Sequence, residues 1–291
     1  MRINTNTAAM NTYSRLTQAN GARGGSMAKL SSGLRINRAG DDAAGLSISE
    51  KMKNQISGLT QATRNAQDGI SLIQTAEGAL NETHSILNRM RDLTVQASND
   101  TNTNDDRLAI QKEMDSLSAE VDRIANQTQF NTKTLLNGDF DAGGGTALSF
   151  QIGSNDTQQI TLNIGNMTAQ GLGLTDDAEP AKSKLVVSGE TEEDTPSAND
   201  FDEVLKTIDT AIKNVSTERA NLGATQNRLE HTINNLTTTK ENLSEANSRI
   251  RDVDMAEEMM EFTKNNILSQ ASTAMLAQAN QMPQGVLQLL G

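Results

Sequence analysis

The chain has no cysteine and no tryptophan among its 291 residues, and aromatic residues make up only 2% of it. Without cysteine it forms neither disulfides nor thiolate metal sites, which fits a protein that works outside the cell; simple scarcity of cysteine explains the absence equally well. With so few aromatic side chains, a core must be built from Ala, Leu, Ile, Val and Met. That composition favours thin helical bundles over thick layered folds. Only three prolines are present, so long uninterrupted helices are permitted.

The charge and hydropathy exclude two classes of partner. The net charge is −12, which disfavours nucleic acid, because binding phosphates requires clustered Lys and Arg. No stretch reaches about 18 consecutive apolar residues, so we expect no membrane span. The first residues lack the apolar core of a cleavable secretory signal, so we expect any export to follow another route.

Nothing in the sequence predicts catalysis. We find no nucleophile paired with a base, no metal-ligand cluster and no Gly-rich phosphate loop. The two histidines, His84 and His231, fall on different predicted helices, whereas a zinc site needs three or four converging ligands. We therefore expect a protein that is not an enzyme and that holds no cofactor or metal.

A strict seven-residue repeat organises residues 203–254. Its fully apolar positions are Ile208, Val215, Leu222, Leu229, Leu236, Leu243 and Ile250. The companion positions three residues earlier are mixed: Leu205, Ile212, Arg219, Gln226, Ile233, Lys240 and Asn247. A strict heptad keeps one narrow stripe of a helix facing a partner, so this pattern predicts a long coiled-coil helix that packs on another part of the chain.

Other segments predict further helices and a β-containing region. Helical periodicity marks 5–36, 46–98, 105–126 and a segment from Met255 that we expect Pro283 to end. The apolar residues that indicate a helix at 5–36 are Ala9, Tyr13, Leu16, Met27, Leu30 and Leu34. Short polar connections imply antiparallel neighbours. Residues 37–45 predict a turn, and 128–138, which end in Asn137-Gly138, predict a hairpin.

Together these elements predict a mainly α fold: a long antiparallel helical coiled-coil bundle with paired terminal helices and a small β-containing insert. We expect 5–36 to pair with 255–290. The domains that we expect are a terminal helical domain of 1–45 and 255–291, a helical rod domain of 46–138 and 203–254, and a variable insert at 139–202. The insert carries twelve Asp and Glu against two Lys, so most of the net negative charge lies there.

Several long motifs resemble those of bacterial flagellin. They are Asn-Arg-Ala-Gly-Asp-Asp-Ala-Ala-Gly-Leu-Ser-Ile-Ser-Glu at 37–50, Ala-Gln-Asp-Gly-Ile-Ser-Leu-Ile-Gln-Thr-Ala-Glu-Gly-Ala-Leu at 66–80, Gln-Thr-Gln-Phe-Asn at 127–131, Leu-Gly-Ala-Thr-Gln-Asn-Arg-Leu at 222–229, Ser-Arg-Ile-Arg-Asp-Val-Asp-Met-Ala at 248–256 and Leu-Ala-Gln-Ala-Asn-Gln-Met-Pro-Gln at 276–284. They occur in the family's order and cover about 1–138 and 203–291; residues 139–202 lie where flagellins vary most.

The resemblance implies a structural subunit that polymerises with copies of itself into an extracellular motility filament. In flagellins the paired chain ends form the filament core. The positions here that match that role, and the binding of the export chaperone, are Ile267, Ala271, Met275, Val286, Leu287 and Leu290. The family leaves the cell unfolded through flagellar type III export, without a cleavable signal peptide. Its further partners are the filament cap and the hook–filament junction proteins.

The same resemblance implies a contact surface on the 46–98 helix. Residues 88–96 are similar to the segment through which many flagellins engage the innate immune Toll-like receptor for flagellin. Arg89, Leu93, Gln96 and, on the next helix, Glu113 match its contact positions. Packing against an adjacent subunit is the alternative role for these residues. For the whole chain, the alternatives are a hook–filament junction protein, which shares the terminal helical pattern, and a coiled-coil adhesin or immune ligand that acts as a monomer.

Overall fold

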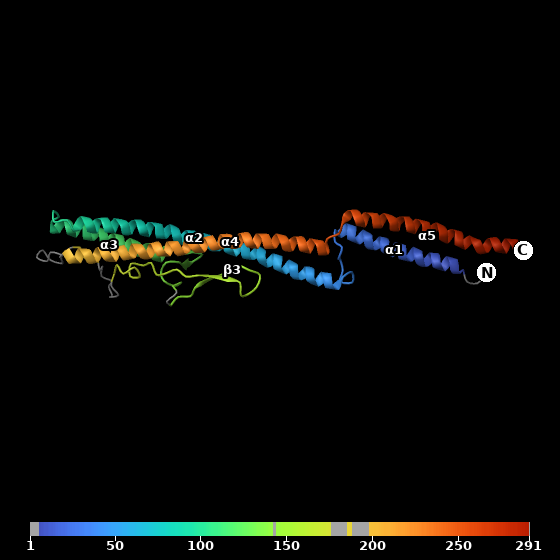
Figure 1. Ribbon diagram of the computed structural model, residues 1–291, viewed down its shortest axis with the longest axis horizontal. Helices are drawn as coiled ribbons and strands as arrows, with labels where there is room; N and C mark the ends of the chain where they lie inside the picture. Colours follow the sequence, from blue (N-terminus) through green and yellow to red (C-terminus); the bar gives the residue numbers. More distant parts are fainter. Residues whose placement is uncertain (1–5, 142–143, 176–184, 188–197, 291) are drawn as a thin grey trace. The chain divides into compact units, whose positions relative to one another are not determined.

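The computed structural model describes residues 6–141, 144–175, 185–187 and 198–290, without the side chains of 198–200 and 282–290. The described residues form five helices and two small antiparallel sheets, so the predicted mainly α fold is confirmed (Figure 1). The chain divides into two compact units, one of Met1–Ile56 with Thr239–Gly291 and one of Ser57–Thr238. The domain boundaries expected from the sequence stay a prediction.

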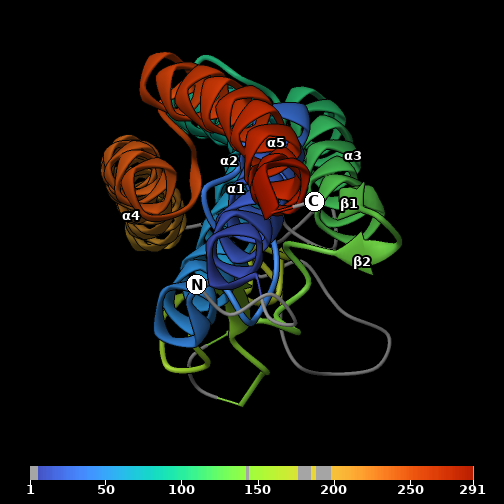
Figure 2. The same cartoon turned by 90° about the vertical axis from the view of Figure 1, so that its right-hand side faces the viewer.

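In the first unit, α1 (Thr7–Ser32) and α5 (Met255–Leu290) lie side by side (Figures 1 and 2). Lys29 is paired with Glu258 near one end, and Asn20 contacts Ser269 farther along, so the two helices run antiparallel. The predicted pairing of 5–36 with 255–290 is confirmed. Gly33 ends α1 in the left-handed conformation, with φ of 70°, where glycine is favoured.

The connection from α1 to α2 (Ala43–Ala97) is the predicted turn at 37–45. The Asp41 carboxylate accepts hydrogen bonds from the backbone N–H groups of Asn37 and Arg38, at 3.0 and 2.8 Å. The Arg38 and Asn37 bonds lower the pKa of Asp41. Beside this turn, the backbone N–H of Arg35 donates to the Arg251 carbonyl at 2.7 Å, and that of Val253 donates to the Gly33 carbonyl at 3.1 Å.

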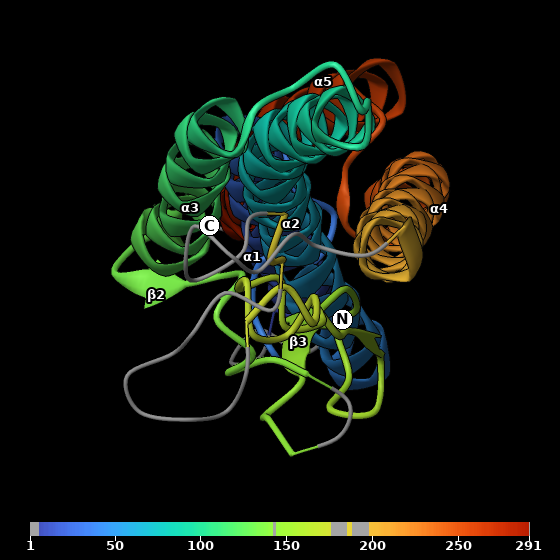
Figure 3. The same cartoon turned by 90° about the vertical axis from the view of Figure 1, so that its left-hand side faces the viewer.

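The second unit contains most of α2 and α4 (Ala198–Arg251) and the whole of α3 (Asn104–Gln127). Seen end-on, α2 lies between α3 and α4 (Figures 2 and 3). An ion pair joins Arg91 of α2 to Asp209 of α4 at 2.8 Å. At the start of α3, Thr103 and Asp106 form a capping box, which satisfies two of the free N–H groups there.

The predicted heptad stripe of α4 is buried, but its companion stripe is not the expected one. Ile208, Val215, Leu222 and Leu229 are 0% exposed and Leu236 is 8% exposed. Leu243 and Ile250, which belong to the first unit, are half-buried. The second stripe lies three residues after the first and consists of Val204, Ala211, Glu218 and Thr225, all of them buried except Glu218, whereas the predicted companions at 205, 212, 219, 226 and 233 are only half-buried. Small side chains let a helix approach its neighbours closely, so they take the inner positions.

The hairpin at 128–138 is confirmed, but the predicted position of its turn is wrong. Strands β1 (Gln129–Phe130) and β2 (Lys133–Thr134) are antiparallel and joined by Asn131 and Thr132, whose φ angles are 49° and 66°. A two-residue turn of this kind needs positive φ at both central residues. Asn137-Gly138, which the sequence favoured, lies beyond the hairpin, where Gly138 adopts a φ of 92°.

The described residues of the insert up to 187 lie along one side of the three helices (Figures 1 and 3). Strands β3 (Leu148–Gln151) and β4 (Gln159–Leu162) form an antiparallel pair. The Asn65 amide of α2 donates to the Gln151 carbonyl at 3.0 Å. Gln111 of α3 donates to the Leu185 carbonyl at 2.9 Å and accepts from the Val187 N–H at 2.8 Å. The acidic run 190–194 lies outside the described residues.

Glu218 places a carboxyl group in the second stripe of α4. Its Oε1 atom is buried and has no hydrogen-bond partner among the described residues. Burial raises the pKa of Glu218, hydrogen bonds from Gly165 and Asn221 oppose that shift, and the nearby Asp141 adds to it. The folded chain therefore binds a proton at Glu218 more tightly than the unfolded chain does.

We predict that Glu218→Gln stabilises the second unit at pH 7. The raised pKa of Glu218 gives stability that is complete below the ordinary pKa of 4.5 and is lost as the pH rises through the folded value. The Gln variant avoids that loss, so its melting temperature should exceed that of the parent by about 2–4 °C at pH 7. The difference should shrink as the pH is lowered to about 4.

Thermal unfolding followed by circular dichroism across this pH range measures the effect. Glu230→Gln is the matched control, because Glu230 is an exposed residue of the same helix. A Glu218→Gln variant that is less stable than the parent at pH 7 would contradict the role given to this carboxyl group.

Candidate assembly surface

The seam between α1 and α5 is built mainly from small and polar side chains, with four large apolar ones half-buried among them. Its positions alternate by three and four residues on both helices: Ala9, Thr12, Leu16, Ala19, Arg23, Ser26 and Leu30 on α1, and Glu258, Phe262, Asn265, Ser269, Ser272, Leu276 and Ala279 on α5. The most buried of them are Ala19, Ser26, Asn265, Ser269 and Ala279. Burying these five residues removes little apolar area from water, so most of the hydrophobic stabilisation of the seam comes from the half-buried Leu16, Leu30, Phe262 and Leu276.

Nine large apolar side chains of the same two helices are exposed to solvent. Each of the nine is 46% to 67% exposed: Met10, Tyr13, Met27, Met255, Met259, Met260, Ile267, Leu268 and Met275. Successive residues of a helix turn by about 100°, which places Met260 and Ile267 opposite the buried positions of α5 and its other exposed apolar residues on the two flanks. An ordinary amphipathic pair has the reverse arrangement, with its large apolar side chains inside. A large exposed apolar set of this kind marks an interaction surface.

A hollow of about 340 Å³ interrupts the surface between α1 and α5. Its lining combines small side chains with longer ones: Ala8, Asn11, Thr12, Arg15, Met275, Gln278 and Ala279. Ala8 and Ala279 leave room that a side chain from another molecule can fill, beside the exposed thioether of Met275.

Polar contacts set the alignment of the two helices. The Ser269 hydroxyl donates to Asn20 at 2.9 Å, Arg23 donates to Asn266 at 3.5 Å, and the Lys29 ammonium lies 3.6 Å from the Glu258 carboxylate. These contacts are partly exposed and therefore add little to stability. They specify which residues of the two helices face each other.

Asn6 makes the most informative of these polar contacts. Its side-chain oxygen accepts from the Ala9 N–H at 3.1 Å and so caps α1, while its amide donates to the Ala279 carbonyl of α5 at 2.8 Å. In a continuous helix that carbonyl would accept from residue 283, but Pro283 has no N–H. The prediction that Pro283 ends the helix is wrong, because α5 continues to Leu290. Asn6 supplies the donor that Pro283 lacks.

The three residues predicted for the filament core whose side chains the structure describes are exposed. Ile267 and Met275 are 60% and 57% exposed, and Ala271 is exposed as well. Val286, Leu287 and Leu290 belong to α5, but their side chains lie outside the described residues. Sequence reasoning missed the contribution of α1, because Tyr13 and Met27 were counted with Ala9 and Leu16 as one apolar face. The three-and-four spacing of 9, 12, 16 and 19 could have separated the two sets.

A second candidate surface lies on α2 and α3. Arg89 donates through Nε and Nη2 to Oε1 of Glu113, at 3.0 and 2.8 Å, and both side chains are exposed. Gln96 is exposed two helical turns from Arg89. Leu93, predicted to contact the same partner, is only 1% exposed and belongs to the hydrophobic core. It supports this face from beneath and does not form part of the surface.

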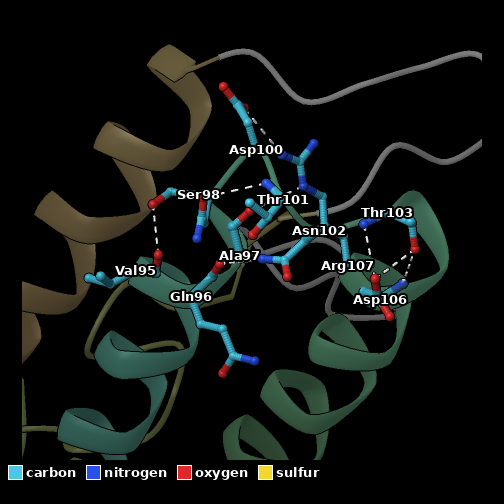
Figure 4. Close-up of polar contacts among 11 residues, drawn as sticks. Val95, Gln96, Ala97, Ser98, Asp100, Thr101, Asn102, Thr103, Asp106 and Arg107 are labelled. Atoms are coloured by element: carbon cyan, nitrogen blue, oxygen red, sulfur yellow. Dashed lines mark hydrogen bonds and ion pairs between the residues drawn. The ribbon is translucent and has the colours of Figure 1, made fainter.

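Polar contacts hold the turn between α2 and α3, the two helices that carry Arg89 and Glu113 (Figure 4). The buried Arg107 of α3 donates through Nε to the Ala97 carbonyl at the end of α2, at 3.1 Å, and its Nη2 lies 3.8 Å from Asp100. The Arg107 guanidinium also lies 5.4 Å from the centre of the Phe201 ring of α4. One cation thus joins the ends of three helices.

In the part of the chain that the structure describes, we find no helix long and apolar enough to cross a membrane.

Comparison with known proteins identifies what the chain is similar to. A family profile described as the bacterial flagellin N-terminal helical region matches residues 3–141, and one described as the C-terminal helical region matches 205–290. The chain is 58% identical to a flagellin of Bacillus subtilis and 52% identical to one of Halalkalibacterium halodurans, with 100% of both chains covered in each case. A solved structure of a proposed flagellar hook-associated protein of Vibrio parahaemolyticus is 19% identical, with 73% of this chain and 100% of that chain covered and a TM-score of 0.58. The last likeness shows the fold alone.

We predict that Asn6→Asp weakens the α1–α5 pair. Aspartate caps a helix as well as asparagine does. It has no amide to donate, so the Ala279 carbonyl loses its partner at a cost of about 1 kcal/mol. In a Pro283→Ala background, the N–H of residue 283 supplies the missing donor, and Asn6→Asp should have almost no effect.

Amide hydrogen exchange in α1, compared for the two single variants and the double variant, measures this coupling. An equal loss of protection from Asn6→Asp in both backgrounds would show that the carbonyl at 279 does not depend on Asn6.

Proposed function

Because this chain belongs to the bacterial flagellin family, the structural subunits of the flagellar filament, we propose that it assembles by burying the outward apolar residues of α1 and α5 against neighbouring copies. The observation that carries the proposal is that nine large apolar side chains of α1 and α5 are exposed, while alanine, serine and asparagine take the most buried positions between the helices. A single copy cannot cover those side chains. Copies related by a repeated rotation and translation that does not close on itself form an open helical filament.

The free energy gained by burying this surface decides whether copies associate. Burying the exposed half of a Met, Leu or Ile side chain contributes about 1 kcal/mol. Summed over the surface, that is about the size of the association cost of ~4–15 kcal/mol. Because the favourable and unfavourable terms nearly balance, one charge placed on the surface is enough to prevent growth.

A hook–filament junction protein is the alternative within the same structural class. The Vibrio structure supports it only through the fold, whereas the full-length relatives at 58% and 52% identity are flagellins. The two functions differ in a simple property. A filament subunit forms long filaments from purified protein, and a junction protein does not.

We also propose that the chain leaves the cell unfolded through the flagellar type III export apparatus and joins the filament at its cap. The absence of cysteine supports this, because no disulfide has to be broken or formed in transit. The weak seam of the α1–α5 pair supports it too, since such a pair unfolds and refolds easily. Before assembly an export chaperone would cover the same outward face of α5, which includes Ile267 and Met275.

A second proposed role is recognition by the innate immune Toll-like receptor for flagellin. Its support is the resemblance at 88–96 together with the exposed pair of Arg89 and Glu113 and the exposed Gln96. The same face is suited to packing against an adjacent subunit. The receptor would then bind the free subunit, in which this face is open.

We predict that Ile267→Asp abolishes filament growth. Ile267 is 60% exposed, so the change leaves the fold of the single chain intact but places a charge in the proposed contact. Ile267→Met keeps the residue apolar and should polymerise like the parent. Electron microscopy and sedimentation, with fragments of parent filaments as seeds, measure both variants.

Circular dichroism of the two variants before polymerisation provides the folding control. If the Asp variant grows filaments at the parent rate, the outward face of α5 is not the assembly contact. If even the parent protein fails to grow long filaments, the junction-protein alternative is favoured.

We predict that Arg89→Glu lowers receptor signalling by about tenfold or more, the usual loss when a charged interface anchor is reversed. A cell reporter assay with monomeric protein measures it. Leu93→Asp is unsuitable as a test, because a charge at a position that is 1% exposed disrupts the core. The matched control is Arg91→Glu, which makes the same change of charge on the side of α2 that pairs with Asp209.

The double variant Arg89→Glu/Glu113→Arg restores the ion pair but leaves the positions of the positive and negative charge exchanged. Signalling by this double variant should stay low if the receptor recognises the arrangement of the charges. Recovery would mean that the pair acts only by holding α2 and α3 together, and unchanged signalling in Arg89→Glu would remove this face as a receptor site.

A further inference from the structure

The methionines of the chain fall into two groups with opposite exposure. Six are 49% to 67% exposed, and all six lie on the α1–α5 pair: Met10, Met27, Met255, Met259, Met260 and Met275. Met90, Met114 and Met167 belong to the second unit and are 0% to 6% exposed. Met52 is half-buried, and the side chains of Met1 and Met282 lie outside the described residues. Every described methionine that is readily accessible to solvent is therefore on the proposed assembly surface.

Methionine gives this surface a chemical reactivity that leucine or isoleucine would not. The thioether sulfur attacks one oxygen of a peroxide, the O–O bond breaks, and the sulfur loses two electrons as it gains that oxygen. With hydrogen peroxide, the other oxygen leaves as water after a proton transfer, so the products are one sulfoxide and one water. Reaction depends on access to the sulfur, so the six exposed methionines should react well before the three buried ones.

The sulfoxide changes the side chain in the property that assembly requires. A flexible apolar group becomes a polar one whose oxygen needs a hydrogen-bond donor. In water that donor is solvent, so the free chain tolerates the change. Met259 and Met260 are adjacent, and Met255 lies one helical turn before Met259, so oxidation would place three such oxygens on a short stretch of α5. Burying them against apolar side chains of another copy would leave them without donors.

We propose that the six exposed methionines are an oxidative modification site that controls assembly, with peroxide-class oxidants as the second substrate. This inference rests on the proposed function, because it assigns the surface to contacts between copies. Oxidation of the free chain produces a folded subunit that cannot join a filament. Chains already in the filament are protected, since the same sulfur atoms are covered there.

Full-length protein oxidised as a monomer with dilute hydrogen peroxide tests the proposal. Peptide mass spectrometry should find sulfoxide at the six positions, with Met90, Met114 and Met167 as unmodified internal references. After removal of the peroxide and addition of parent filament seeds, the polymerised amount should fall about tenfold or more. The same peroxide dose given to finished filaments should leave the six positions unmodified and the filaments intact.

Two controls separate loss of assembly from damage to the fold. Methionine sulfoxide reductases return the sulfoxide to the thioether, so treatment of the oxidised monomer should restore growth. A variant with Met259→Leu and Met260→Leu keeps two positions apolar under peroxide, and it should retain more growth after oxidation than the parent does. Circular dichroism should be unchanged by oxidation at this dose.

The experiments distinguish a failure of this inference from a failure of the proposed function. Oxidised monomer that polymerises as well as untreated monomer would overturn this inference and leave the proposed function standing, since that function is tested separately by Ile267→Asp. Filaments whose six methionines oxidise as fast as those of the monomer would mean that the surface stays open in the polymer. That result would overturn both this inference and the assignment of the surface to assembly.

Discussion

The structure depends on the small and polar seam that joins α1 to α5. Alanine, serine and asparagine take its most buried positions, a few hydrogen bonds align the helices, and only four large apolar side chains are half-buried there. Nine other large apolar side chains of the pair are turned outward. The free energy that completes this unit must therefore come from outside it, which links the folding of the chain ends to the association of copies.

The second unit has the opposite character. Its α4 stripe of Ile208, Val215, Leu222 and Leu229 is fully buried, and Arg107 joins the ends of α2, α3 and α4. A unit built this way contains its own core and holds its surface residues in fixed positions. The chain thus combines a self-sufficient unit, which carries the Arg89–Glu113 face, with a pair of helices that is incomplete alone.

The sequence predicted the fold correctly where a residue pattern fits only one arrangement, and incorrectly where it fits two. The heptad stripe of α4 was predicted correctly from Ile208 to Leu236, because its evenly spaced apolar positions admit one facing stripe. The second stripe was not, because positions three residues before and after the first both lie beside it, and the apolar Leu205 and Ile212 favoured the wrong side. The hairpin turn was misplaced since Asn131-Thr132 lacks the glycine that usually marks positive φ.

The residues of the candidate surfaces could also be predicted only in part. Part of the outward face of α5 could be predicted, because the resemblance to flagellin assigned Ile267 and Met275 to contacts between copies. Leu93 could not be assigned correctly, since a motif match gives the identity of a residue and not its accessibility. The contact between Asn6 and Ala279 joins residues 273 positions apart, and only the fold brings them together.

The Asn6 amide and the Ala279 carbonyl also solve a problem of alignment. A seam of alanine and serine would fit almost equally well if one helix slid along the other by a heptad, because small side chains offer few steric obstacles. Because of Pro283, the Ala279 carbonyl is an acceptor without an intrahelical donor at one position along α5. The Asn6 amide is the matching donor at one position along the chain that leads into α1. Sliding would leave both without a partner, so a local defect in one helix gives the pair a unique register, as a lone buried polar residue does in a coiled coil.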